Sequence, residues 1–162
     1  MTSEVRGTRS TRDIRDEQRG NPRFERGHAK LLELGDSGDA IFTALADVAP
    51  DMGRYVAEFV FGDLYGRGGL DDRQRQLVTL ALLTALGDTE RQFAFHLNLA
   101  LNAGVEPQEV VDALVHGLAF VGFPRTFNGL STAKRVFAER GLLPVAEPAD
   151  AEPAVAESAA AG

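Results

Sequence analysis

The chain of 162 residues contains no cysteine. This absence excludes disulfides, thiolate metal sites and thiol redox chemistry. The sequence also has no apolar run near the ~20 residues that span a bilayer, and no apolar stretch typical of a signal peptide. The net charge is −7, so we expect the surface to repel nucleic acid and anionic membranes. These absences predict a cytoplasmic protein whose partners include no nucleic acid and no membrane.

The hydrophobic residues recur with the period of α-helices, and no alternating strand pattern is bounded by turn signals. The breaks are marked by glycine and proline, most clearly at Gly87, at Gly104 and at Gly122-Phe123-Pro124. The fourth predicted helix, which begins at Asp71 or Asp72, is apolar on nearly every face from Leu77 to Leu86 and should be central and buried. The pattern predicts an all-α fold of six or seven helices, at residues 23–34, 39–48, 51–60, 72–86, 90–101, 107–121 and 124–139.

Both ends of the chain have compositions that do not favour folding. Residues 1–22 mix arginine with acidic residues, and residues 144–162 are mostly alanine, proline and glutamate. Neither segment can bury enough apolar surface to fold alone. We therefore expect a disordered leader over 1–22, or an arm that orders against a neighbouring subunit. A single domain is expected over 23–143, and a disordered tail over 144–162.

Two histidines, His96 and His116, lie inside otherwise apolar helical runs. Each could be a core histidine with one hydrogen bond to the backbone. Two of them on adjacent helices also suit proton transfer, because buried imidazole stays neutral and available near pH 7. Asp112, one helical turn before His116, could orient that ring. No pair of residues has the spacing of metal ligands, so no metal is predicted.

Arginines stand beside helix starts at Arg73, Arg75 and Arg125. Guanidinium groups next to helix N-termini bind carboxylates. The alternative is that these arginines form ion pairs with acids on neighbouring helices or subunits, as most surface charges do. The sequence leaves both interpretations open.

Several short segments resemble the carboxymuconolactone decarboxylase family. The resemblance covers residues 23–141. Its segments are Arg23-Phe24-Glu25-Arg26-Gly27, Leu34-Gly35-Asp36, Phe61-Gly62-Asp63-Leu64-Tyr65, Gly69-Leu70-Asp71 with Arg73 and Arg75, Leu77-Val78-Thr79-Leu80-Ala81, Leu83-Thr84-Ala85-Leu86-Gly87, His96-Leu97, Asn102-Ala103-Gly104-Val105, His116, Gly122 and Pro124.

The resemblance implies an all-α alkylhydroperoxidase-like subunit that assembles into homotrimers or homohexamers. One branch of this family uses a Cys-x-x-Cys motif, a histidine and a glutamate. At those positions this chain has Thr89, Gln92, His96 and Gln76, so thiol peroxidase chemistry is excluded. The other branch resembles the decarboxylase that converts 4-carboxymuconolactone to an enol-lactone without a cofactor. That chemistry needs an anion clamp and a proton donor.

The resemblance therefore implies a cofactor-independent carboxy-lyase acting on a small carboxylate or lactone. In this hypothesis His96 transfers the proton, His116 assists or orients, and Glu58 or Asp63 tunes a histidine. The residues expected to bind substrate are Arg73, Arg75, Arg125, Asn98, Phe61 and Tyr65. Tryptophan is typical where Phe61 and Tyr65 stand, a basic residue where Asn98 stands, and Ala-Ala-Asn after the proline where this chain has Arg125-Thr126-Phe127.

These departures leave the substrate open. Alternatives are an isomerisation or cyclisation in secondary metabolism, or a non-catalytic oligomeric protein that binds a ligand or partner. A catalytic protein should place the two histidines in a pocket with at least one arginine. A non-catalytic one should have them in closed packing.

Overall fold

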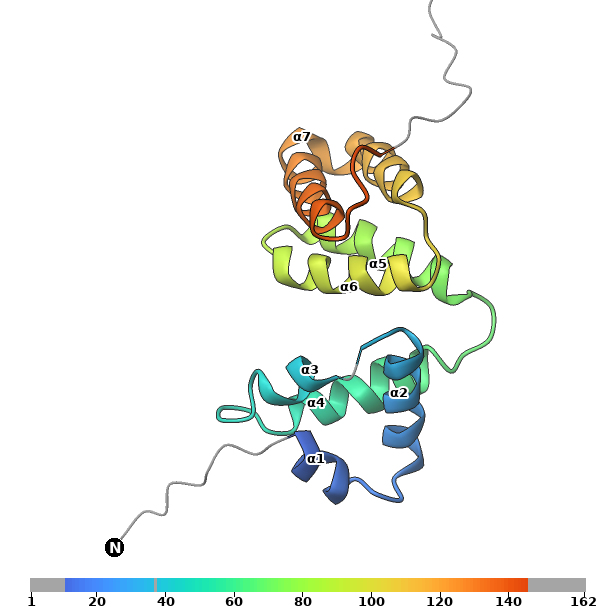
Figure 1. Ribbon diagram of the computed structural model, residues 1–162, viewed down its shortest axis with the longest axis vertical. Helices are drawn as coiled ribbons and strands as arrows, with labels where there is room; N and C mark the ends of the chain where they lie inside the picture. The colour runs from blue at the N-terminus through green and yellow to red at the C-terminus, as the bar shows by residue number, and fades with distance from the viewer. Residues whose placement is uncertain (1–10, 37, 146–162) are drawn as a thin grey trace, which may run out of the picture.

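The computed structural model describes residues 11–36 and 38–145, and these residues form helices joined by turns, with no strand among them. The all-α prediction is confirmed. The elements are α1 (Thr11–Glu17), α2 (Pro22–Glu33), α3 (Asp39–Thr43), α4 (Met52–Tyr55), the π-helix η1 (Val56–Leu64), α5 (Asp72–Leu86), α6 (Glu90–Asn102) and α7 (Pro107–Glu139). Figure 1 shows α1–α4 gathered in one region and α5–α7 in another.

The C-terminal region is held by one apolar core. α6 and α7 pack on the same side of α5, and Leu80, Leu97, Leu114 and Phe137 are at most 2% exposed. This core explains why the predicted helices 72–86, 90–101 and 107–121 form where their apolar stripes lie.

The N-terminal region is built on the close crossing of α2 and η1. A Cβ atom at Gly27 would lie 1.8 Å from the carbonyl oxygen of Ala57, so no residue larger than glycine fits there. Around this crossing lie Phe24, Leu31 and Phe42, joined by Leu99 from α6. Leu99 therefore links the cores of the two regions.

The break predicted at Gly122 is confirmed. Gly122 has φ 78° and ψ 168°, which interrupts the helical path of α7 just before Pro124. By length and composition alone, α7 is long and apolar enough to cross a membrane, although only 17% of its most apolar window is buried. The kink leaves two segments, each shorter than the ~20 residues that span a bilayer.

Three local expectations differ from the structure. α1 is helical inside the predicted leader, where residues 11–17 were expected to be disordered; residues 1–10 and 146–162 lie outside the described residues. α3 ends at Thr43 instead of Val48, and its N-cap is Gly38. The single helix predicted over 51–60 is instead the short α4 followed by the π-helix η1, which continues to Leu64.

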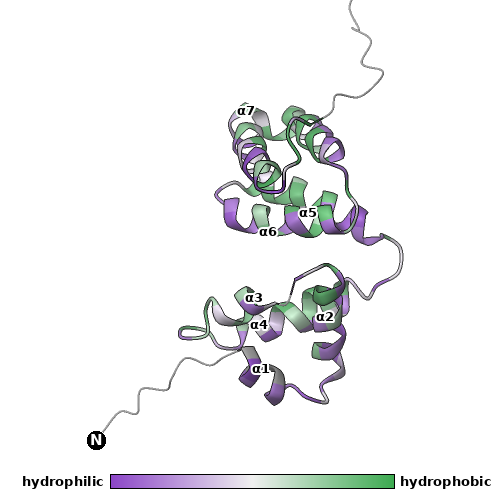
Figure 2. Ribbon diagram, viewed as in Figure 1, coloured by the Kyte–Doolittle hydropathy of each residue, from purple (hydrophilic) through white to green (hydrophobic). Residues whose placement is uncertain are grey.

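The prediction that α5 is buried on nearly every face is wrong for the described residues. Its buried row is Gln76, Leu80 and Thr84, whereas Val78, Leu82 and Leu86 are 49%, 59% and 67% exposed. The reason is geometric, because α6 and α7 cover only one side of the helix. Figure 2 shows hydrophobic residues along α5 and α7, while α1 is mostly hydrophilic.

Candidate functional site

Three polar side chains form a hydrogen-bonded chain where the N-terminal region of α1–η1 meets the C-terminal region of α5–α7. We call this place the junction. Nδ1 of His96 on α6 lies 3.1 Å from Oε1 of Gln76 on α5. Nε2 of Gln76 donates to the hydroxyl of Tyr65 at 2.9 Å. Gln76 is fully buried, with no exposed surface. We call this set the His96–Gln76–Tyr65 chain.

Local structure fixes each member of this chain. Gln76 heads the buried row of α5, one helical turn before Leu80. Tyr65 follows η1 directly, and its backbone N–H donates to the carbonyl of Val60 at 3.0 Å, a bond five residues back that is typical of a π-helix. The ring of Phe61 lies 5.0 Å from that of Tyr65 and is itself buried. The π-helix thus places both predicted aromatic residues at the junction.

All three members of the chain are neutral near pH 7. Burial lowers the pKa of His96 to about 4, so the ring carries one proton. Because Oε1 of Gln76 only accepts, that proton sits on Nδ1 and leaves a lone pair on Nε2. Burial, helped by the Asp72 carboxylate, raises the pKa of Tyr65 to about 12, so the phenol keeps its proton.

Arg75 lies beside this chain. Its guanidinium carbon is 5.6 Å from the centre of the Tyr65 ring. Its Nε donates to the carbonyl of Leu70 at 3.1 Å and its Nη2 to that of Arg67 at 2.6 Å. No carboxylate among the described residues pairs with Arg75, so its charge is available to an anion.

The other two predicted arginines are committed elsewhere. Nη2 of Arg73 lies 2.7 Å from both carboxylate oxygens of Glu109, an ion pair between α5 and α7. Arg125 donates to the carbonyl of Ala85 at the end of α5. Among the three arginines, only Arg75 contacts the His96–Gln76–Tyr65 chain.

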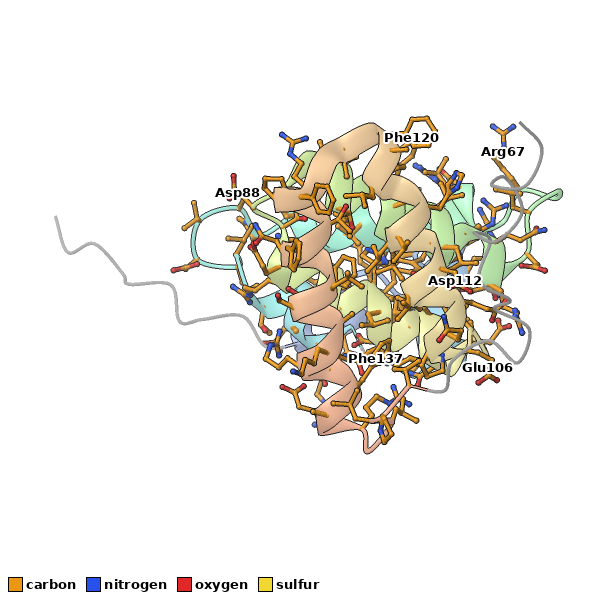
Figure 3. The ribbon with its side chains drawn as sticks, turned by 90° about the horizontal axis from the view of Figure 1, so that it is seen from above. Arg67, Asp88, Glu106, Asp112, Phe120 and Phe137 are labelled. Atoms are coloured by element: carbon orange, nitrogen blue, oxygen red, sulfur yellow. The ribbon has the colours of Figure 1, made fainter. Side chains whose placement is uncertain are left out.

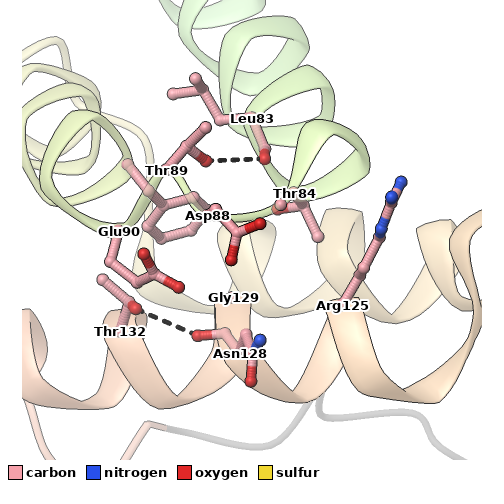
Figure 4. A pocket seen from close by; sticks show the side chains of 11 residues that line it. Leu83, Thr84, Asp88, Thr89, Glu90, Arg125, Asn128, Gly129 and Thr132 are labelled. Atoms are coloured by element: carbon pink, nitrogen blue, oxygen red, sulfur yellow. Dashed lines mark hydrogen bonds between the residues drawn. The ribbon is translucent and has the colours of Figure 1, made fainter.

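Arg125 borders a small hollow between the α5–α6 turn and α7 (Figure 4). This open hollow has a volume of about 20 Å³, enough for one water molecule. A second hollow lies between α1 and α2, beside Phe24 and His28. Neither of these two hollows is lined by His96 or His116, so neither is the pocket in which a catalytic protein was expected to hold both histidines.

Glu58 does not reach either histidine within the described residues. Its carboxylate lies 3.2 Å from Nη1 of Arg54 and 3.5 Å from Nη1 of Arg23, and it accepts from Asn21 at 2.9 Å. Asp63 is paired with Arg23, whose hydrogen bond lowers the pKa of that carboxyl group. Both acids therefore hold α2 against η1.

His116 lies on an exposed part of α7, apart from the His96–Gln76–Tyr65 chain. Its ring is 5.6 Å from that of Phe120, and it makes no hydrogen bond within the described part of the protein. Asp112 accepts from Gln108 at 2.8 Å rather than orienting His116. Asn98 donates to the carbonyl of Ala94 and accepts from Arg140 at 3.2 Å.

The structure thus brings together His96, Tyr65, Phe61 and Arg75 from the predicted set, and adds Gln76. Sequence reasoning noticed Gln76 only as the counterpart of a glutamate in the resemblance. The available signal was a polar residue four positions before Leu80, at the head of an apolar helical row.

In the described residues, no group of three or more His, Asp and Glu side chains could hold a metal ion. The polar groups that converge at the junction are instead an imidazole, an amide, a phenol and a guanidinium. Such a set can bind an anion and exchange hydrogen bonds with a carbonyl oxygen.

Comparison with known proteins defines the class. Residues 50–135 match the model of the carboxymuconolactone decarboxylase family. The matched residues include α5, α6 and most of α7. The chain belongs to this family, and the resemblance found in the sequence is confirmed.

Three relatives are similar to parts of this chain. The chain is 32% identical over 100 residues to 4-carboxymuconolactone decarboxylase of Acinetobacter baylyi, covering 62% of this chain and 74% of that protein. It is 30% identical over 97 residues to an uncharacterised 15.0 kDa protein of Paracoccus denitrificans, covering 59% and 72%. It is 28% identical over 81 residues to nitrosuccinic acid decarboxylase of Metarhizium robertsii, covering 49% and 55%.

Proposed function

We propose that this protein is a cofactor-independent carboxy-lyase that acts on a small carboxylate or lactone. The observation that carries the proposal is the buried, neutral His96–Gln76–Tyr65 chain beside an arginine with no carboxylate partner. Two of the relatives described above are named decarboxylases, which supports the same reaction class.

Arg75 supplies the anion clamp that this chemistry needs. One of its terminal nitrogens, Nη1, makes no hydrogen bond within the described residues. A charge-assisted bond from Nη1 holds a substrate carboxylate next to Tyr65. A clamp on a carboxylate that stays with the substrate leaves the departing carboxylate free to lose carbon dioxide.

His96 plays a different part from the one that the sequence suggested. At neutral pH its Nε2 atom has no proton to give, because burial lowers the pKa to about 4. The imidazole can accept a hydrogen bond from substrate at Nε2 while Nδ1 holds Gln76 in place. His96 is therefore an acceptor and positioning residue rather than the general acid.

The test is carbon dioxide release from two substrates in parallel, 4-carboxymuconolactone and nitrosuccinate. We expect turnover of one of them by the wild-type protein and its loss in His96→Ala. His116→Ala, measured beside it, decides whether the exposed histidine also takes part. A folded protein that releases carbon dioxide from neither substrate would overturn this choice of substrates and favour a retooled or non-catalytic family member.

We further propose that the protein works as a homotrimer or homohexamer. The support is apolar surface that a single subunit leaves open: Phe120, Phe123 and Phe127 are 78%, 64% and 62% exposed. Figure 3 shows Phe120 pointing away from the helices at the outer edge. With aromatic side chains of about 200 Å² each, these three alone expose about 400 Å², as much as the largest patch of a typical monomer.

Light scattering tests this assembly. A trimer or hexamer at micromolar concentration is expected, and Phe120→Ser together with Phe123→Ser should shift the population toward monomer. A wild-type protein that stays monomeric would contradict the assembly.

A further inference from the structure

We propose that Tyr65 is a catalytic residue that donates the hydrogen bond to the enolate oxygen formed when carbon dioxide leaves the substrate. The sequence analysis assigns Tyr65 only to substrate binding. The inference rests on the proposed function, and it adds the group that stabilises the charge developing in the reaction.

The first step of the argument is the direction of the hydrogen bonds. His96 Nδ1–H donates to Gln76 Oε1, and Gln76 Nε2–H donates to the Tyr65 hydroxyl oxygen. Both bonds run the same way, so each polarises the next. The chain ends at the Tyr65 O–H, which becomes a stronger donor because its oxygen already accepts from Gln76.

The second step is that no group in the described part of the protein accepts a hydrogen bond from this terminal O–H. The Tyr65 hydroxyl makes no hydrogen bond as a donor within the described residues, although the side chain is partly buried. Because the side chain is only partly buried, this O–H can donate to an oxygen from outside the protein, either of water or of a ligand. Burial and the carboxylate of Asp72 raise the pKa of Tyr65, and this carboxylate forms an ion pair with Lys30 at 3.1 Å.

The third step is the charge beside Tyr65. The Arg75 guanidinium lies over the phenol ring, 5.6 Å from its centre. A ligand carboxylate bound to Arg75 therefore lies beside the Tyr65 side chain, and a carbonyl oxygen of the same ligand can accept a hydrogen bond from the Tyr65 hydroxyl. The ligand class that fits is a small carboxylate with a conjugated carbonyl or lactone group.

The fourth step is the reaction itself. The bond from carbon to the departing carboxylate breaks, carbon dioxide leaves, and the electron pair moves through the conjugated system to the carbonyl oxygen. The Tyr65 O–H stabilises that oxyanion without losing its proton, since burial raises the pKa of the phenol to about 12. Water then protonates carbon, and the hydroxide combines with carbon dioxide, so that substrate carboxylate and water give product and bicarbonate.

The kinetic test compares the two tyrosines of the protein, Tyr65 and Tyr55. Tyr65→Phe removes the donor and keeps the ring that packs on Phe61, while Tyr55→Phe changes an exposed ring outside the junction. We expect Tyr65→Phe to lower kcat about 100-fold with KM changed less than about threefold, as for loss of one oxyanion donor. Tyr55→Phe should match wild type. A Tyr65→Phe protein with wild-type kcat would overturn the proposal.

A binding test decides the proposal even if neither substrate turns over. The probe is 5-(carboxymethyl)tetronate, a five-membered lactone that is an enolate at neutral pH and carries a carboxylate for Arg75, and its binding is measured by calorimetry. We expect wild type and Tyr55→Phe to bind it equally and Tyr65→Phe to bind it at least about tenfold more weakly. Equal binding by Tyr65→Phe, or no binding by wild type at millimolar probe, would overturn the role of Tyr65. Weakened binding without turnover of either substrate would refute the proposed substrates alone.

Discussion

The two regions of the molecule are stabilised in different ways. The α5–α7 region rests on an apolar core of leucine, valine, alanine and phenylalanine side chains. The α2–η1 region has a smaller core and a polar seam, in which Glu58 and Asp63 hold arginines of α2 and α4. In the His96–Gln76–Tyr65 chain, Tyr65 follows the end of η1, whereas Gln76 lies on α5 and His96 on α6.

This difference explains where the candidate site lies. Inside the apolar core, the polar groups of such a chain would have a large desolvation cost. Within the polar seam, they would form hydrogen bonds with the arginine side chains instead of with one another. At the junction, a buried amide can bridge an imidazole and a phenol that remain neutral. Changes to the α5–α7 core, to the junction and to the polar seam should therefore alter the stability of the protein by different amounts.

Loss of core packing should have the largest effect. Leu80 is 1% exposed in the α5–α7 core, so Leu80→Ala should lower the free energy of unfolding by about 3 kcal/mol. Leu32→Ala, at a side chain 53% exposed on α2, is the matched control and should cost less than about 0.5 kcal/mol. Urea unfolding measures both; equal losses would mean that the core is not where the structure places it.

Acid should weaken the junction next. His96 has its pKa lowered from 6.5 to about 4, so between these values the unfolded chain binds a proton that the folded protein does not. Stability from this group is therefore complete above pH 6.5 and falls as pH drops to 4, by about 3 kcal/mol in total. Urea midpoints at several pH values should show a flatter profile in His96→Gln. The His116→Gln control should keep the wild-type slope; if His96→Gln keeps it too, His96 is not the group responsible.

The polar seam should show a smaller effect. Glu58 is 6% exposed and bonded to three side chains, so Glu58→Gln should cost about 2 kcal/mol of unfolding free energy. Glu33→Gln breaks an exposed ion pair with Lys30 and should cost under about 1 kcal/mol. Thermal unfolding distinguishes the two variants. If Glu58→Gln is as stable as wild type, the polar seam does not stabilise the protein.

Local sequence signals predicted much of the fold. Proline at the first position of α7 and glycine at the Gly122 break are visible in the sequence because caps and breaks depend on neighbouring residues. His96 stands out in the sequence as a polar residue in an apolar run, and in the structure it is hydrogen-bonded to Gln76. The proton-transfer role that the sequence suggested for His96 gives way to the acceptor and positioning role proposed above.

Pairings between distant residues were not predictable in this way. Glu58 accepts from Asn21, which lies 37 positions earlier, and Arg73 pairs with Glu109, which lies 36 positions later. Nothing in local spacing selects those partners over His96 or a substrate. The exposure of one side of α5 was not predicted for a related reason. Local periodicity cannot show which apolar face of a helix the rest of the protein leaves uncovered.

The most direct test of the central claim is carbon dioxide release by Gln76→Leu and Gln76→Glu. If the bridge between His96 and Tyr65 organises the site, Gln76→Leu should lower kcat/KM at least about 100-fold. Gln76→Glu keeps the side-chain size, and it should also fail while raising the pKa of His96, because it places a carboxylate beside the imidazole. Gln108→Leu removes a hydrogen-bonded amide on α7 and should match wild type. Wild-type kcat/KM in both Gln76 variants, with the protein folded, would contradict a functional site at this junction.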